Sequence, residues 1–166
     1  FRGSSTNYYF PLDFTVGGAV ASFGRRLEWP DDFFRVMWSA KFMQKEYEGS
    51  QSDIDNYIGG LQKTRGISLS QVLSRDSRNR AEFPTNGSTF ILENTYSGGF
   101  LGGNENFQKH MLTLDWFTPT FSKFILYNSV KLGVIKTLDV GDDIQSFVPF
   151  DERFIMGGNG IPYGNA

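Results

Sequence analysis

Apolar and polar residues alternate with a period of two along most of this chain. The alternation is clearest from Phe33 to Tyr47, where the sequence reads FFRVMWSAKFMQKEY. The even-numbered positions are mostly apolar, whereas the odd-numbered positions include the cations Arg35, Lys41 and Lys45. Successive side chains of a β-strand point to opposite faces, so this stretch is predicted to be a strand whose two faces meet different solvents.

The same alternation recurs in five further stretches. In the first of them, the apolar residues Leu12, Phe14, Val16 and Val20 alternate with residues that are mostly small. Six strands of roughly ten residues are therefore expected, which is near the length that a tilted strand needs to cross a bilayer. The five further stretches are Leu12–Phe23, Ile67–Asp76, Thr89–Tyr96, Phe107–Phe117 and Lys123–Ile135.

The connections between these strands alternate in character. Leu27–Asp32 and Thr118–Ser122 are short, whereas Glu48–Gln62, Ser97–Asn106 and the stretch from Leu138 onward are longer, polar and rich in Gly, Asp and Asn. Short turns at one end and long loops at the other are typical of a transmembrane β-barrel. Aromatic residues near the strand ends are candidates for the girdles of such a barrel: Trp29, Tyr47, Tyr96, Trp116 and Phe117.

A soluble antiparallel sheet also alternates apolar and polar residues, so the pattern alone leaves two fold classes open. The length of the strands and the cations in mid-strand favour the membrane. We therefore predict an all-β fold, an antiparallel meander that forms part of a transmembrane β-barrel. Five charged residues are the candidates for side chains that face the lumen: Lys41, Lys45, Lys109, Asp115 and Lys131.

Composition narrows the possible functions. The 166 residues carry a formal net charge of -2, so no overall basic field would attract nucleic acid, and no nucleic-acid partner is expected. The chain has no cysteine, which excludes disulfides, thiolate metal sites and cysteine nucleophiles within it. Aromatic residues make up 16% of the chain and Gly numbers 19, a balance that favours strands and tight turns over helices.

Candidate catalytic chemistry is sparse. His110 is the one histidine, lies near a strand start and is interpreted as a residue at the barrel rim. The paired glycines lack the Lys-Ser/Thr that a phosphate-binding loop requires. The acidic stretch from Asp139 to Glu152 and the pair Asp53 and Asp55 are interpreted as solvated loops rather than Ca²⁺ sites. We therefore expect no enzyme activity, no cofactor and no metal.

One turn carries more specific chemistry than the others. It lies within SRDSRNRAEFPTNGSTF, residues 74–90. Pro84 fixes its own φ angle, and Gly87 can adopt the positive φ that a tight reversal needs. Asp76 has three possible partners: Arg75, Arg78, or backbone N–H groups of the turn.

Three motifs resemble the BamA family of outer-membrane assembly barrels, and they occur in the family's order. The turn just described is similar to a periplasmic turn of that family through Arg75, Asp76, Arg78, Phe83, Pro84, Thr85 and Gly87. GRRLEWPDDFF, residues 24–34, resembles a second periplasmic turn through Trp29, Pro30, Asp31 and Asp32. PFDERFIMGGNGIPYG, residues 149–164, resembles the start of the sixth extracellular loop through Phe154, Gly157, Gly158 and Gly160.

This resemblance implies a barrel of about sixteen strands in the bacterial outer membrane, preceded by periplasmic POTRA domains. Residues 1–166 would be one piece of that barrel, roughly strands six to eleven plus the start of the sixth loop. We expect further chain on both sides, including the terminal strands. The family's Arg-Gly-aromatic motif of the sixth loop is not found at Ile161–Gly164.

The resemblance also implies a function, the folding and insertion of outer-membrane proteins into the bilayer. The implied partners are unfolded outer-membrane proteins, accessory outer-membrane lipoproteins and the lipid bilayer itself. Three alternatives remain open: a related pore that translocates polypeptides, a diffusion porin, and a soluble β-domain used for binding.

Overall fold

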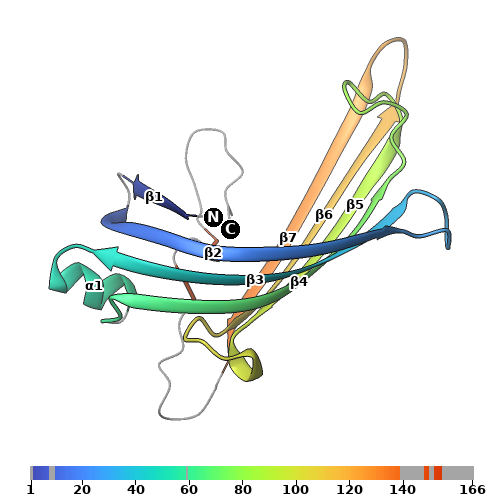
Figure 1. The fold of residues 1–166 in the computed structure, drawn as a ribbon. Coiled ribbons are helices and arrows are strands. Elements are labelled where there is room, and N and C mark those ends of the chain that lie inside the picture. Colours follow the sequence, from blue (N-terminus) through green and yellow to red (C-terminus); the bar gives the residue numbers. More distant parts are fainter. Residues whose placement is uncertain (1, 8–9, 59, 139–147, 150–151, 155–166) are drawn as a thin grey trace.

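A computed structural model describes residues 2–7, 10–58, 60–138, 148–149 and 152–154. It confirms the predicted fold class, because a single antiparallel meander forms one curved sheet (Figure 1). Each strand pairs with its neighbours in the sequence, so β1 and β7 form the two edges. The strands are β1 (Arg2–Asn7), β2 (Phe10–Arg26), β3 (Phe34–Glu48), β4 (Lys63–Asp76), β5 (Gly87–Ser97), β6 (Phe107–Pro119) and β7 (Ile125–Thr137).

The six predicted strands correspond to β2–β7, and the structure adds three elements that the alternation did not reveal. β1 is a short strand that pairs with the first half of β2. The connection between β3 and β4, expected to be irregular, contains the helix α1 (Gln51–Ile58). A second long connection contains the 3₁₀ turn η1 (Gly99–Leu101). No helix among the described residues is long and apolar enough to span a membrane.

The strand register sorts the side chains into two faces. Residues paired across an antiparallel ladder point to the same side of the sheet, and successive residues point to opposite sides. Lys41, Lys45, Lys109, Asp115 and Lys131 all fall on one face, which we call the lysine face. Phe23, Trp38, Phe42, Leu69, Leu112 and Leu132 fall on the opposite face, which we call the apolar face.

Burial in this sheet is the reverse of what a soluble sheet shows. Large side chains of the apolar face are exposed, including Trp38 (43%), Leu69 (45%) and Leu132 (60%). Polar side chains of the lysine face are buried instead, including Lys45 (2%) and Thr64 (1%). A soluble sheet buries its apolar face. The described strands therefore leave an extended hydrophobic surface that needs an apolar environment.

Many of the apolar residues of β2 point to the other side of the sheet from those of the following strands. Val16 pairs with Lys45 and Val20 pairs with Lys41, so the apolar positions of β2 lie on the lysine face. Its small residues, such as Ala19 opposite Phe42, lie on the apolar face.

Two of the aromatic residues that were predicted to lie in a girdle do not face the membrane side of the sheet. Tyr47 is only 6% exposed and lies on the lysine face, as does Phe117, which stacks on Tyr127 at 4.8 Å.

Candidate functional site

The two turns singled out in the sequence lie at the same end of the sheet and are joined by side chains. Arg75, near the end of β4, donates through Nε to Oδ2 of Asp31 in the β2–β3 turn, at 2.8 Å. Its guanidinium also lies over the rings of Phe33 and Phe34, 5.5 and 5.8 Å from their centroids. Asp31 caps its own turn, because its Oδ1 accepts from the backbone N–H of Phe33 at 2.9 Å.

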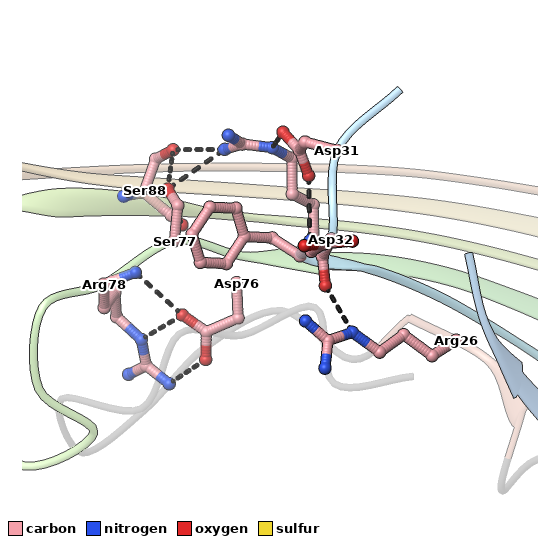
Figure 2. Close-up of polar contacts among 9 residues, drawn as sticks. Arg26, Asp31, Asp32, Asp76, Ser77, Arg78 and Ser88 are labelled. Atoms are coloured by element: carbon pink, nitrogen blue, oxygen red, sulfur yellow. Dashed lines mark hydrogen bonds and ion pairs between the residues drawn. The ribbon is translucent and has the colours of Figure 1, made fainter. Parts of the chain in front are cut away.

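Asp76 has a different partner. Arg78 holds its carboxylate with two side-chain bonds, Nε to Oδ1 at 2.9 Å and Nη2 to Oδ2 at 2.7 Å (Figure 2). The backbone N–H of Arg78 adds a third bond at 3.1 Å. Of the possible partners, Arg78 and its backbone are thus the ones used. The hydrogen bond to Asp76 raises the pKa of Arg78 above its ordinary value, so this pair stays ionised near neutral pH.

Asn79 organises the rest of the β4–β5 turn. Its side-chain oxygen accepts the backbone N–H groups of Thr85 and Asn86, and its amide donates to Oγ1 of Thr85 at 2.7 Å. Gly87 has the expected positive φ, 105°, and a Cβ there would overlap the carbonyl oxygen of Ser77. Glycine is therefore required at this position both for its backbone angle and for space.

Each of the three connections at this end presents at least one strongly exposed aromatic residue. Trp29 is 82% exposed, Phe83 88% and Phe121 77%. Phe83 also has a φ of 50°, a conformation in which a bulky residue is uncommon. The turn therefore holds this ring outward at some conformational cost, a combination that is frequent at contact sites.

On the lysine face, two lysines converge on the segment that follows β7. Lys109 donates through Nζ to the backbone oxygen of Glu152 and contacts its Oε2, both at 3.1 Å, while Lys41 lies 3.7 Å from Oε1. The Nζ of Lys109 also lies 5.5 Å from the ring centroid of Phe154. A Cβ at Gly133 of β7 would overlap that ring. Residues 152–154 are thus held against the sheet by charge and by close packing.

The third lysine belongs to a buried network. Lys45 lies 3.5 Å from Oε1 of Glu105, and the hydroxyl of Thr64 donates to the same oxygen at 2.9 Å. Lys45 and Glu105 are 2% and 5% exposed. Gly66 has no room for a Cβ, because the Glu105 carboxylate occupies that space. This network fixes the β5–β6 connection over the lysine face.

Asp115 and Lys131 lie apart from these clusters. Asp115 accepts hydrogen bonds from the hydroxyls of Thr89 at 3.0 Å and Tyr127 at 2.9 Å. Lys131 pairs with Thr113 across the β6–β7 ladder, on the same face. The five lysine-face residues therefore share a face but do not form one site.

The remaining residues that the sequence singled out do not come together in one site among the described residues. His110 lies on the apolar face of β6, where its Nδ1 is 2.8 Å from Oδ1 of Asn94. Gly157, Gly158 and Gly160 lie outside the described residues, as does most of the acidic stretch from Asp139. Among the residues that are described, no three acidic or histidine side chains gather as a metal site would require. The sequence did not single out Arg26, Arg35 and Glu105 as site residues, although Arg26 lies within GRRLEWPDDFF and Arg35 follows it directly. No local motif marks Glu105.

Comparison with known proteins identifies the family of this chain. The Omp85 superfamily domain matches residues 4–166, so the chain belongs to the Omp85 superfamily. It is 30% identical over 111 residues to the outer membrane protein assembly factor BamA of Nitratidesulfovibrio vulgaris (strain Hildenborough). That alignment covers 64% of this chain and 13% of the relative. The chain therefore matches only a small part of the length of this relative.

Proposed function

We propose that this chain forms part of the wall of an outer-membrane barrel that folds and inserts other outer-membrane proteins. The reversed burial of the sheet is the observation that carries the proposal. The apolar face, with Trp38, Leu69 and Leu132 exposed, suits contact with lipid, and the polar lysine face suits a wet lumen. Membership of the Omp85 superfamily and similarity to an outer membrane protein assembly factor support the same function.

The orientation of the wall follows from its connections. We assign the end with these exposed aromatic residues to the periplasm, because barrels have short turns there and aromatic side chains favour the interface between bilayer and water. Unfolded outer-membrane proteins would arrive at this end as clients. The exposed rings of Trp29 and Phe83 offer accessory lipoproteins a contact surface beside the membrane.

In this proposal the wall acts without a catalytic group. An unfolded strand cannot enter lipid with its backbone N–H and C=O groups unpaired, so an insertase must offer it hydrogen-bonding partners. The described strands pair with one another along the meander and form a stiff support. The ion pairs of Lys41 and Lys109 with Glu152 hold the start of the sixth loop against this support.

The test is an assembly assay with the full-length protein in liposomes. An unfolded outer-membrane protein is added, and its folding is followed by protection from protease. Lys109→Glu should slow client folding several-fold by expelling Glu152, and the double variant Lys109→Glu with Glu152→Lys should restore much of the rate. Lys136→Glu is the matched control, because Lys136 lies on the apolar face of β7 and the same charge change there leaves the ion pairs with Glu152 intact.

Two results would contradict this function. If wild-type protein leaves the folding rate of the client unchanged from that in empty liposomes, the chain is not part of an insertase. If the client instead crosses the bilayer and becomes protected inside the liposome without folding into the membrane, the protein is a translocating pore.

A further inference from the structure

The lysine face contains a pocket at the end where the two joined turns lie. Its volume is about 480 Å³, and four arginines and two aspartates are among the residues that line it. The arginines are Arg26, Arg35, Arg75 and Arg78. Figure 2 shows part of this region, with Arg26 on one side and the Asp76–Arg78 pair on the other.

The charges of this pocket are only partly balanced. Asp76 is held by Arg78, and Arg75 is paired with Asp31. Arg26 donates through Nε to the backbone oxygen of Asp32 at 2.7 Å, which neutralises no charge. Arg35 forms no ion pair with any of the described residues. Neither Arg26 nor Arg35 therefore has a carboxylate within ion-pair distance among the described residues, although Asp32 and Asp76 also line the pocket and the charge of Arg35 acts on Asp76.

These two arginines are also direct neighbours. Arg26 of β2 pairs with Arg35 of β3 across the ladder, so both project from the lysine face side by side. Like charges placed directly opposite each other destabilise a sheet. An anion bound between them would remove this repulsion and could accept hydrogen bonds from both guanidinium groups.

We propose that this pocket binds the carboxylate groups of an extended polypeptide. The inference rests on the proposed function, which brings unfolded chains to this end and this face of the sheet. The planar fork of a guanidinium matches a carboxylate, and the neighbouring Ser74 and Thr89 add hydroxyls to the pocket wall. Lipid phosphates would lie beside the apolar face, on the other side of the sheet, which favours a peptide as the source of the anion.

The experiment is a calorimetric titration of the full-length protein in detergent micelles. The probe is a capped seven-residue Gly/Ser peptide that contains two glutamates, and its counterpart contains two glutamines. We expect the glutamate peptide to bind at least about tenfold more tightly, since hydrogen bonds between charged partners are the stronger ones. Arg26→Gln and Arg35→Gln should each weaken its binding by about fivefold or more.

Arg25→Gln is the matched control, because Arg25 is adjacent to Arg26 in β2 and projects from the apolar face. It should change the affinity by less than about twofold, as expected for a screened charge outside the pocket. Equal losses in the Arg25 and Arg35 variants, or equal binding of both peptides, would overturn the proposal. Inorganic phosphate that displaces the peptide at equal concentration and ionic strength would show a site for free oxyanions instead.

The liposome assay on the same preparations separates the two proposals. Wild-type protein that binds the glutamate peptide but folds no client would refute the proposed function and would still support carboxylate binding by the pocket. Wild-type protein that folds the client but binds neither peptide would refute the pocket alone. Unchanged mobility of the unheated variants in gel electrophoresis would show that each barrel is folded.

Discussion

Arg75 of β4 and Asp31 of the β2–β3 turn are 44 residues apart in the sequence, yet their side chains are joined by a hydrogen bond of 2.8 Å. This one contact ties together two turns that the sequence presents as separate motifs. It joins strands that also pair directly, since Phe34 lies opposite Arg75 in the β3–β4 ladder. Both side chains are about one-third exposed, so water weakens the ion pair without removing it.

We expect Arg75→Ala to lower the free energy of unfolding more than Asp31→Ala does. The arginine loses its stacking on Phe33 and Phe34 as well as the ion pair, for a cost of about 1 to 2 kcal/mol, whereas the aspartate costs about 0.5 to 1 kcal/mol. Urea unfolding of the full-length protein in phospholipid vesicles measures both. Arg80→Ala, in the β4–β5 turn, is the control. A loss of stability in this variant equal to that of Arg75→Ala would contradict the prediction.

Gly87→Ala should destabilise the β4–β5 turn by about 2 kcal/mol or more, because it combines an unfavourable φ with overlap on the Ser77 carbonyl oxygen. Gly102→Ala separates these two causes. Gly102 also has a positive φ, 81°, but a Cβ there meets nothing within 4 Å, so only the backbone cost of about 1 to 2 kcal/mol is expected. The same vesicle unfolding experiment applies. Similar losses at both positions would show that the overlap contributes little.

Neutralising only one charge of the buried pair Lys45 and Glu105 should lower the stability of the protein clearly. Glu105→Gln replaces one charged partner of Lys45, which is 2% exposed, with a neutral group, and we expect a loss of about 1 to 3 kcal/mol. The double variant Lys45→Met with Glu105→Leu removes both charges of this pair and should recover part of that loss. Thermal unfolding followed by circular dichroism compares the variants. A double variant less stable than Glu105→Gln would rule out this explanation.

The row Gln71, Asn94 and His110 places polar side chains on the apolar face. Oδ1 of Asn94 is 2.8 Å from Nδ1 of His110, and its amide donates to Oε1 of Gln71 at 3.5 Å. Asn94→Leu leaves its two neighbours without this partner and should cost about 1 kcal/mol in vesicles. Replacing Asn94 and His110 together with leucine should be neutral or stabilising if this face contacts lipid. Additive losses in a double-mutant cycle would indicate that the contact is not made.

The alternation of side chains was sufficient to predict β2–β7, because a strand that faces two different environments carries this information in its own residues. β3 shows this well, since Phe42 and Lys41 reach opposite faces as their positions require. The positive φ of Gly87 was also predictable, because the backbone of a tight turn restricts which residue can occupy that position.

Pairing between strands decided the rest. The valines of β2 share a face with Lys41 and Lys45 because of the register with β3, which the sequence of β2 alone does not contain. Asp76 does not pair with Arg75 because successive residues of β4 point to opposite faces, and Arg75 meets Asp31 of a distant turn instead. Arg26 and Arg35 become neighbours only in the ladder. The sequence determined the strands β2–β7 and which side chains share a face within each of them. The tertiary structure determined which charges meet, because ion pairs depend on distances in space and not along the chain.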